Sequence, residues 1–347
     1  MRDTSKIDYF FLTGIGFLIL FSTVVLRVTA SSLFPLYFFF IFIALVAFSL
    51  FSILGFEIIS LFSRFFYVGS IVFLILPILI GQITRGTVRW ITLGALSIQP
   101  AEIIRPFLLV YFANYLTEKE LTFKRLIKSC LLFILPVVLI LIQPSLGVAF
   151  LTAIGFLGLL FSVKLEKKYF LFLILGIFLV IPVGWKVIAP YQSQRILAFL
   201  NLSSDPLGSG YNSMQSKISV GSGKLFGRGL GKGVQTQLSF LPERQTDFIF
   251  AAISEELGFI GSLLILVGEF FIFYKLSLFI DNSVNYASRT YITSFLLVLF
   301  SQTIVHIGMN LGLLPITGVP LPLVSAGGSS LLGTMIGLSL CLGARKK

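Results

Sequence analysis

The sequence predicts an all-α polytopic membrane protein, a single bundle of about ten transmembrane helices with a large extracytoplasmic loop before the eighth. Composition is the first observation: 56% of the 347 residues are hydrophobic, only 12% are charged, and the mean hydropathy is +1.01. A soluble domain carries roughly a quarter charged residues, so this chain cannot cover a water-facing surface. The second observation is that apolar runs of about 20 residues, long enough to cross hydrocarbon as helices, recur along the chain.

These apolar runs predict the following helices in chain order: 9–28, 33–54, 66–83, 102–117, 128–143, 146–163, 168–188, 248–277, 288–311 and 322–343. Run length favours helices, because the strands of a membrane barrel would alternate in hydropathy over about ten residues. The runs on either side of Gln143-Pro144-Ser145 have a second interpretation, as one long kinked segment. The first run lacks a clear small-residue cleavage site, which favours a retained helix over a signal peptide.

The basic residues indicate how the bundle is oriented, because short cytoplasmic loops carry an excess of Lys and Arg. Ten spans place both termini on one side. The short loops and termini of that side contain Arg2, Lys6, Arg64, Lys119, Lys124, Arg125, Lys128, Lys164, Lys167, Lys168, Lys275, Arg289, Arg345, Lys346 and Lys347. We therefore expect cytoplasmic termini and one transmembrane domain over 1–347, with 189–247 as its large outer loop. The net charge of +12 does not indicate nucleic-acid binding, because the cations are scattered between apolar spans.

Ionisable residues in or beside membrane spans are costly, so each one is a hypothesis for a functional site. On the outer side, Arg89 precedes Trp90, an expected interface anchor, and Glu102 and Arg105 begin the next span. The last two are three residues apart, so they share a helix face and can pair. They form either an internal ion pair or part of a cationic pocket for a phosphorylated headgroup, because Arg binds phosphate oxygens bidentately.

A glycine-rich stretch, 221–233, carries Lys224, Arg228 and Lys232. It is not a nucleotide-binding P-loop, because the GK[ST] ending is missing and no strand precedes it. Its glycines allow close backbone approach and its cations add charge, so it is either a phosphate-binding segment or a flexible, re-entrant or surface loop.

Asp247 lies where the eighth span begins, and a helix N-terminus favours a carboxylate. It is either a simple helix-start acid or a base that faces a lipid-borne substrate. Glu255 and Glu256 follow about two turns later and do not share its face, so we expect them to pair with internal cations such as Arg105. His306, the only histidine, is expected to be a hydrogen-bonded packing residue.

The stretch 312–330 contains three prolines and four glycines at the start of the last span. Irregular backbone at membrane depth is tolerated only inside protein or along a wet cavity, so we expect a helix break beside a close-packed seam of small residues. Cys130 and Cys341 lie in or beside apolar runs and predict neither a disulfide framework nor a metal site.

These stretches together resemble the bacterial SEDS family (shape, elongation, division and sporulation). The matching motifs are QPAEIIRP at 99–106, the segment 205–261 that contains PERQTDFIF, and GLLPITGVPLPLVSAGGSS at 312–330. The wording PERxTDFIF and GVPLPLVS is RodA-like rather than FtsW-like. The resemblance implies a ten-span fold in the bacterial cytoplasmic (inner) membrane. It also implies peptidoglycan glycosyltransferase activity on lipid II and a class B penicillin-binding transpeptidase partner.

By the same resemblance, Asp247 matches the family's essential extracellular carboxylate, Arg89 the arginine of its RW motif and Glu102 the glutamate of its QPxE motif. Four positions depart from the family pattern: Arg105 for Lys, Gln245 for His, Ser145 for Asp and Ala326 for Tyr. Gln245 and Ser145 cannot act as acid–base groups, whereas Asp247 is retained.

The implied reaction needs a carboxylate to take a hydroxyl proton, and Asp247 suits that task. It also needs positive charge at the leaving diphosphate, which Arg89 can supply with Glu102, Arg105, Lys224 and Arg228 as further substrate-binding candidates. No cofactor motif is present, and a divalent cation (Mg²⁺ or Mn²⁺) stays open as another source of charge. Two alternatives compete: a flippase or transporter of a lipid-linked precursor, and a non-catalytic scaffold for a wall-building transpeptidase.

Overall fold

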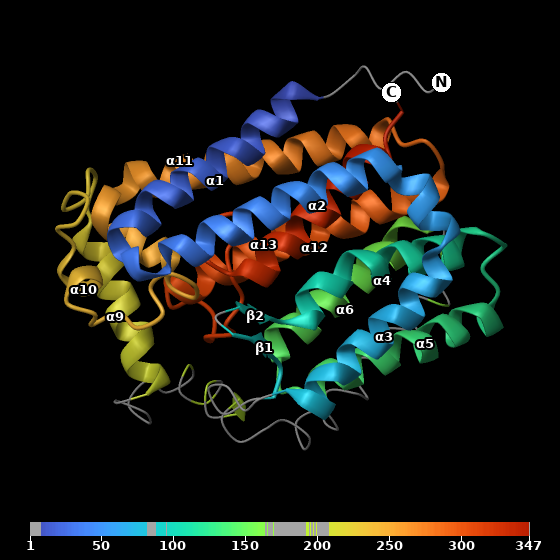
Figure 1. Cartoon of the computed structure of the whole chain (residues 1–347), viewed down its shortest axis with the longest axis horizontal. Helices are drawn as coiled ribbons and strands as arrows, with labels where there is room; N and C mark the ends of the chain where they lie inside the picture. The colour runs from blue at the N-terminus through green and yellow to red at the C-terminus, as the bar shows by residue number, and fades with distance from the viewer. Residues whose placement is uncertain are drawn as a thin grey trace.

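Long helices run back and forth along one axis of the molecule (Figure 1). The computed structural model describes residues 8–81, 88–94, 96–163, 165, 169, 192–193, 195, 197, 199 and 208–346. The elements are α1 (Tyr9–Thr29), η1 (Ser31–Leu33), α2 (Phe34–Leu61), α3 (Ser63–Ile80), β1 (Ile91–Leu93), β2 (Leu96–Ile98), α4 (Pro100–Thr117), α5 (Phe123–Ile142), α6 (Leu146–Ser162), α9 (Ser209–Ser222), α10 (Val234–Gln237), α11 (Ile249–Asp281), α12 (Tyr286–Asn310) and α13 (Gly328–Gly343).

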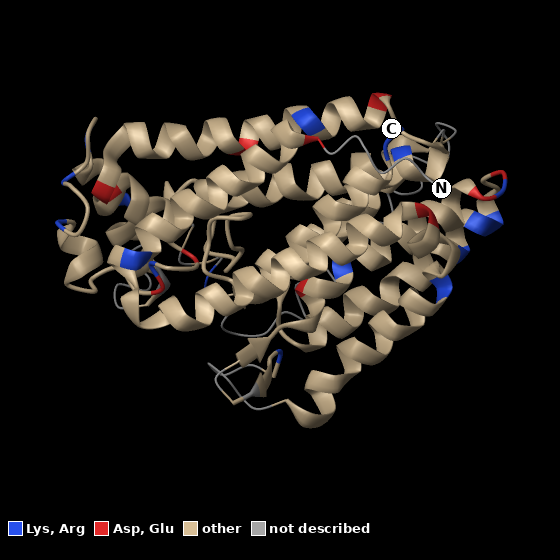
Figure 2. Ribbon diagram, turned by 45° about the horizontal axis from the view of Figure 1, so that its top comes forward, with Lys and Arg blue, Asp and Glu red and all other residues tan. Residues whose placement is uncertain are grey.

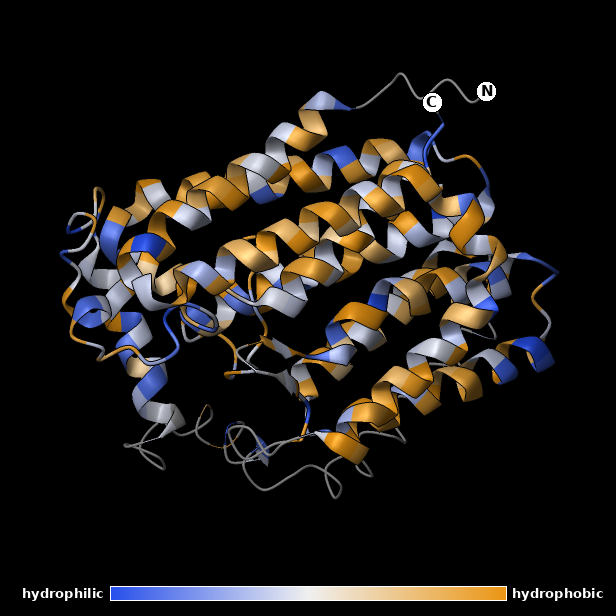
Figure 3. Cartoon of the chain, in the orientation of Figure 1, coloured by the Kyte–Doolittle hydropathy of each residue, from blue (hydrophilic) through white to orange (hydrophobic). Residues whose placement is uncertain are grey.

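The helices have the length and composition of membrane spans. Within the described part of the chain, α1, the η1–α2 segment, α3, α5, α11 and α12 are each long and apolar enough to cross a bilayer. Helices α6 and α13 are shorter apolar helices. Figure 3 shows hydrophobic residues along the lengths of the helices and more hydrophilic residues toward their ends. The predicted polytopic helical membrane fold is therefore confirmed, while the expected span 168–188 falls outside the described residues.

Several helix boundaries differ from the predicted ones by a few residues, and two larger differences and one predicted alternative need a physical explanation. Helices α5 and α6 are separate, so the two-helix interpretation around Gln143 is correct. Helix α2 extends to Leu61 through a break at Gly55, whose φ of 72° is the left-handed conformation that glycine adopts readily. Helix α13 begins at Gly328 rather than near 322. Proline is tolerated in a first helical turn, but Leu323 has a φ of 58° and Gly327 is extended, so the backbone between them does not form a helix.

Both chain ends lie at one end of the bundle (Figure 1). The Asp8 carboxylate accepts a 2.9 Å hydrogen bond from the Phe11 backbone N–H, which caps α1. The same carboxylate pairs with Lys275 at 3.1 Å and with Arg345 at 2.9 Å. Burial acts to raise the pKa of Asp8, but the Phe11 hydrogen bond and the two cations outweigh it and hold that pKa below its ordinary value. This cluster joins the start of α1 to the ends of α11 and α13.

Small residues let α13 pack closely inside the bundle, mainly against α2 and α4. A side chain at Gly333 would collide with the carbonyl of Glu102, and one at Gly337 would collide with the ring of Phe295. Packing of this kind is typical of membrane helices, where small residues allow backbones to approach. The expected small-residue seam is therefore present, and it fixes the end of the bundle where α4 and α13 both begin.

Candidate active site

A cavity of about 300 Å³ lies at the end of the bundle opposite the chain termini. The segments that border it are the starts of α2, α4 and α6, the β1–β2 hairpin, and the chain before α11 and α13. Its polar lining consists of Tyr37, Arg89, Trp90, Ser97, Gln99, Glu102, Ser145, Arg195, Gln245, Thr246, Asp247, Thr317, Ser329 and Ser330. Arg89 and Asp247, two residues far apart in the sequence, therefore border one cavity, which agrees with their expected roles in one reaction.

Asp247 directs its carboxylate toward the backbone of the 312–327 segment. A Cβ added at Gly318 would lie 3.5 Å from Oδ2 of Asp247 and 3.9 Å from Nη1 of Arg195. Gly318 has a φ of 67°, which a residue with a side chain adopts only under strain. The glycine therefore leaves room for no more than a methyl group in van der Waals contact with the Asp247 carboxylate, and Arg195 borders the same position.

Three hydrogen bonds fix the backbone around Asp247. The Asn310 amide donates to the Asp247 carbonyl at 3.0 Å, and its Oδ1 accepts from the Ala251 N–H at 3.0 Å. One residue earlier, the Thr246 carbonyl accepts from the Ser325 hydroxyl at 2.8 Å. Asn310 is completely buried. The end of α12 and the segment before α13 thus position the start of α11, and no sequence motif had pointed to Asn310 for this role.

Two arginines supply positive charge to the lining. Arg89 lies immediately before β1, with its guanidinium 5.9 Å from the centre of the Trp90 ring. Trp90 was expected to anchor the membrane interface, and the structure places it in the cavity lining. Arg195 donates from Nη1 to the Ile316 carbonyl at 3.3 Å. Sequence reasoning missed Arg195, because among the scattered cations of 189–247 nothing local distinguishes it.

Glu102 and Arg105 form the buried ion pair that their spacing predicted. The Glu102 Oε2 and Arg105 Nη2 atoms are 3.0 Å apart, and each side chain is only 5% exposed. Glu102 lines the cavity and Arg105 stands behind it. Nearby, the Gln99 amide donates to the Ser145 hydroxyl at 3.1 Å, and the Gln99 backbone N–H donates to Ser329 at 2.8 Å. The QPxE motif therefore joins α4 to α6 and to the start of α13.

Lys224 and Arg228 are exposed and do not line this cavity. The expected pairing of Glu255 and Glu256 with internal cations such as Arg105 is wrong. Both glutamates are fully buried and instead accept hydrogen bonds from the loop that precedes them, including 2.8 Å from the Gln235 N–H to Glu255 and 2.9 Å from the Gln237 amide to Glu256. Backbone N–H groups can replace cations as partners of a buried carboxylate, and a side-chain pattern does not reveal them.

Three of the four positions that depart from the family pattern, Ser145, Gln245 and Ala326, line the cavity, so these departures change its interior. His306 is buried and its Nδ1 lies 2.8 Å from the Val319 carbonyl, which agrees with a packing role.

In the described part of the chain, His, Cys, Asp and Glu form no group of three or more that could hold a metal ion. The cations in the described lining of the cavity are Arg89 and Arg195.

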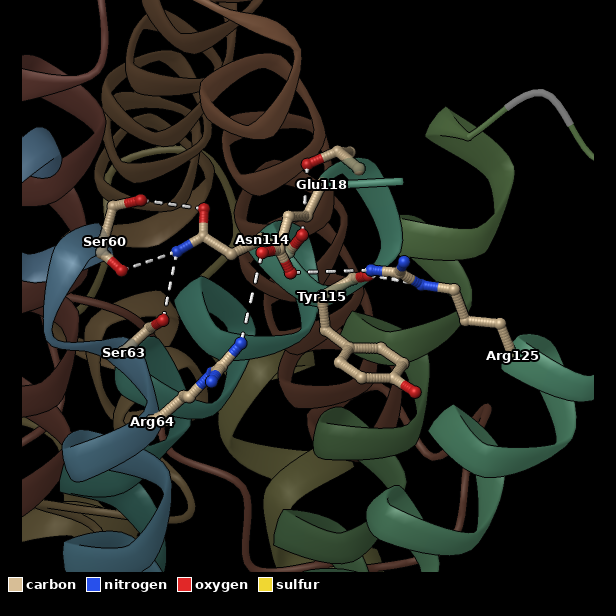
Figure 4. A network of polar contacts seen from close by, with 8 residues as sticks. Ser60, Ser63, Arg64, Asn114, Tyr115, Glu118 and Arg125 are labelled. Atoms are coloured by element: carbon tan, nitrogen blue, oxygen red, sulfur yellow. Dashed lines mark hydrogen bonds and ion pairs between the residues drawn. The ribbon is translucent and has the colours of Figure 1, made fainter. Parts of the chain in front are cut away.

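A second cavity of about 850 Å³ lies at the other end of the bundle, between the end of α2, the start of α3, the end of α4 and the start of α12. Its polar residues bind one another (Figure 4): Asn114 donates to the Ser60 carbonyl at 2.9 Å, and Glu118 lies 4.0 Å from Arg64 and 3.7 Å from Arg125. No described residue lines both cavities.

The chain is similar to known proteins in family, sequence and structure. Residues 4–347 match the family of cell cycle proteins named for FtsW, RodA and SpoVE. The chain is 37% identical over 284 residues to the peptidoglycan glycosyltransferase MrdB of Escherichia coli K12, covering 81% of this chain and 76% of that protein. It is 39% identical over 271 residues to a probable peptidoglycan glycosyltransferase FtsW of Wigglesworthia glossinidia brevipalpis, covering 75% and 69%.

Solved structures have the same fold. One is a peptidoglycan synthase complex studied for the coordination of polymerization and crosslinking, with a TM-score of 0.83, 27% identity and 96% coverage of both chains. Another is the rod shape determining protein RodA of Thermus thermophilus, with a TM-score of 0.73, 24% identity and coverage of 97% and 95%. The similarity therefore extends over nearly the whole bundle, including the end that holds the cavity.

Proposed function

The chain belongs to the FtsW, RodA and SpoVE family and is a RodA-like peptidoglycan glycosyltransferase, and we propose that it polymerises lipid II with Asp247 as the general base. The observation that carries the proposal is that Asp247 and Arg89 line one cavity, with Arg195 beside the carboxylate. A glycosyl transfer from a diphosphate needs both kinds of charge in one place.

In the proposed reaction, the 4-hydroxyl of one lipid-linked disaccharide attacks the anomeric carbon of a glycan linked to a polyprenyl diphosphate. The bond from that carbon to the diphosphate oxygen breaks as the new glycosidic bond forms. Asp247 takes the hydroxyl proton, as a positioned carboxylate can. A single displacement without a carboxylate nucleophile inverts the anomeric centre. The hydrogen bond from Asn310 to the Asp247 carbonyl fixes the backbone that carries this base.

The departing diphosphate gains negative charge, which preorganised cations stabilise. Arg89 and Arg195 approach the cavity from different segments of the chain, so we assign them to this role. Arginine suits it, because the planar guanidinium binds phosphate oxygens in a bidentate manner. Glu102 is paired with Arg105, and we assign that pair to holding the lining in shape.

We place the cavity at the outer face of the bacterial cytoplasmic membrane and both termini in the cytoplasm. The cations of the short loops support this orientation, because Arg64, Lys119, Lys124, Arg125 and Lys128 all lie near the starts of α3 and α5 and the end of α4, away from the cavity. We propose a class B penicillin-binding transpeptidase as partner. The matched synthase complex, in which polymerization is coordinated with crosslinking, supports that choice.

The flippase alternative requires a path that reaches both membrane faces. The two cavities lie at opposite ends of the described bundle and share no lining residue, which favours chemistry at one face. The scaffold alternative predicts no turnover even with the partner present, and it is tested by the same assay as the base.

The test is glycan polymerisation by the purified full chain with its transpeptidase partner and lipid II. Asp247→Asn keeps the shape of the side chain and removes the proton acceptor, so we expect at least a hundredfold loss of rate. Asp281→Asn, an exposed acid at the other end of α11, serves as the matched control and should retain the rate of the unsubstituted chain. Unchanged synthesis by Asp247→Asn would overturn the assignment of the base.

A further inference from the structure

The glycine-rich loop between α9 and α10 is built into a break in α11. In a continuous helix, the N–H groups of Phe259 and Ile260 would bond to the carbonyls four residues earlier, those of Glu255 and Glu256. Gly258, with φ 67° and ψ −159°, interrupts that pattern. The interruption leaves two donors and two acceptors without helical partners, at a depth where unpaired backbone groups are costly.

The loop satisfies all four of these groups. The Phe259 and Ile260 N–H groups donate to the carbonyls of Lys224 and Leu225 at 2.9 and 3.2 Å. In return, the Arg228 and Gly229 N–H groups donate to the carbonyls of Glu255 and Glu256 at 2.9 and 3.0 Å. The loop therefore has a defined backbone position rather than the freedom that its glycine content suggests.

Glycines make this close approach possible. A side chain at Gly227 would collide with the backbone of Glu256, and one at Gly258 would collide with the backbone of Gly227. The buried carboxylates add further bonds, since the Thr236 N–H and hydroxyl both donate to Glu255, at 2.9 and 2.6 Å. Because the backbone is held at so many points, the side chains that the loop exposes cannot easily fold inward.

Those exposed side chains are apolar or cationic. The large apolar residues Leu225, Phe226, Leu230, Val234, Leu238 and Phe240 are between 43% and 73% exposed. Lys224, Arg228 and Lys232 are exposed among them, and residues 221–242 contain no Asp or Glu. Figure 2 shows blue segments on the loops at this end of the bundle. Exposed apolar residues in such a cluster are a sign of contact with a protein or a membrane.

The position of the loop along α11 favours the membrane, rather than a protein, as the contact partner of these exposed side chains. Lys275, which pairs with Asp8, marks the polar boundary at the end of the bundle that holds the termini. About 20 helical residues span roughly 30 Å, the thickness of the hydrocarbon core, so the other boundary falls near Glu255. Leu225 is hydrogen-bonded just inside that boundary, at Ile260, and Phe259 and Ile260 are themselves 58% and 41% exposed.

We propose that loop 224–240 anchors the protein at the membrane surface. Its apolar side chains insert into the leaflet on the side of the candidate active site, and Lys224, Arg228 and Lys232 bind the phosphates of anionic phospholipids. Apolar insertion combined with basic residues is the usual means of binding at an anionic membrane surface. The anchor is separate from the catalytic cavity, which these cations do not line. It holds the start of α11, and hence Asp247, at the level of the lipid headgroups.

The test uses the full chain in vesicles of phosphatidylethanolamine and phosphatidylglycerol, either of which can carry bromine on its acyl chains to quench tryptophan. Phe226→Trp adds a reporter on the loop, and its signal is taken as the difference from the unsubstituted chain. Leu263→Trp, on the lipid-exposed face of α11, is the quenched control, and Lys119→Trp, in an exposed loop at the other end, is the unquenched control.

We expect the tryptophan at position 226 to be quenched by both brominated lipids, with phosphatidylglycerol favoured about fivefold or more, the effect of one basic residue near an anionic surface. Adding Lys224→Gln, Arg228→Gln and Lys232→Gln together should remove the preference but keep the quenching. The matched triple Lys119→Gln, Lys124→Gln and Lys128→Gln should keep both. No quenching at position 226, or equal quenching by the two lipids before charge removal, would overturn the proposal. Leu225→Trp provides a second reporter if Phe226→Trp does not fold.

Discussion

The Asn310 side-chain amide donates a 3.0 Å hydrogen bond to the backbone carbonyl of Asp247. Asn310 ends α12, and Asp247 precedes α11, so this contact joins two helix ends across 63 residues of sequence. The same side chain accepts from the Ala251 N–H and donates to the His306 carbonyl at 2.7 Å. One buried amide thus holds together the backbone that presents the proposed base.

We expect Asn310→Ala to lower both stability and turnover. The substitution leaves the Asp247 carbonyl and the Ala251 N–H without this partner, at a cost of about 1 to 3 kcal/mol for each unsatisfied group. Thermal unfolding in detergent and polymerisation at saturating lipid II measure the two effects. Asn282→Ala is the control, because that exposed amide bonds only to the Leu278 carbonyl of its own helix. Full activity in Asn310→Ala would show that the Asp247 backbone is held by other contacts.

Gly318→Ala tests the space beside the Asp247 carboxylate. The new methyl group would lie 3.5 Å from Oδ2, where the acceptor hydroxyl must approach, so we expect about a tenfold loss of turnover or more. The positive φ adds a strain of about 1 to 2 kcal/mol. Gly94→Ala is the control for that strain, because Gly94 has a similar φ of 62° and its added methyl group would meet nothing within 4 Å. Equal activity losses in the two variants would assign the effect to strain alone.

The ion pairs at the two ends of α4, one buried and one exposed, should contribute very different amounts to the free energy of unfolding. Arg105→Gln leaves the Glu102 carboxylate buried without its cation, and the free energy of unfolding should fall by about 3 to 5 kcal/mol. Arg64→Gln breaks the 4.0 Å contact with Glu118, whose partners are 82% and 54% exposed (Figure 4), and should cost only about 0 to 1 kcal/mol. Denaturant titration of both variants measures the difference, and similar costs would contradict the buried pairing.

The lowered pKa of Asp8 predicts that the folded chain loses stability in acid. Its pKa is lower in the folded chain than its ordinary value, so the unfolded chain binds a proton first as pH falls. The stabilisation is fully present above the ordinary pKa of Asp, near 4, and is lost as pH falls through the lower, folded value. The difference in melting temperature between the unsubstituted chain and Asp8→Asn should be constant from pH 7 to about 5 and shrink below about pH 4. A pH-independent effect of Asp8→Asn would contradict the charge pairing.

Local patterns predicted the parts of the molecule that depend on local geometry. Run length identified the helices, and the spacing of Glu102 and Arg105 predicted their buried pair. The motif resemblance placed Arg89 and Asp247 in one site, and they do line one cavity. Each of these signals is carried by helix periodicity or by a short conserved-looking motif, and neither requires knowledge of which helices become neighbours.

Contacts between distant backbone segments were not predictable in the same way. Asn310 and Arg195 act on carbonyl groups far away in the sequence, so neither spacing nor charge singled them out. The glutamates at 255 and 256 were assigned to cations, because the pattern of side chains contains no information about which loop amides will reach them. The start of α13 was placed too early, since apolar residues continue through a segment whose backbone is not helical at Leu323 and Gly327.

Glu255→Gln should loosen the loop that packs against the break in α11. Glu255 accepts from the Gln235 N–H through one oxygen and from the Thr236 N–H and hydroxyl through the other. A glutamine offers one oxygen and one NH₂ group, so at least one of these buried donors loses its acceptor, at a cost of about 1 to 3 kcal/mol. Amide hydrogen exchange should become faster across 224–237, while the rest of α11 keeps its protection. Glu120→Gln, an exposed glutamate in the loop before α5, is the matched control. Unchanged exchange in the loop would mean that the helix break alone, rather than the buried carboxylate, holds it in place.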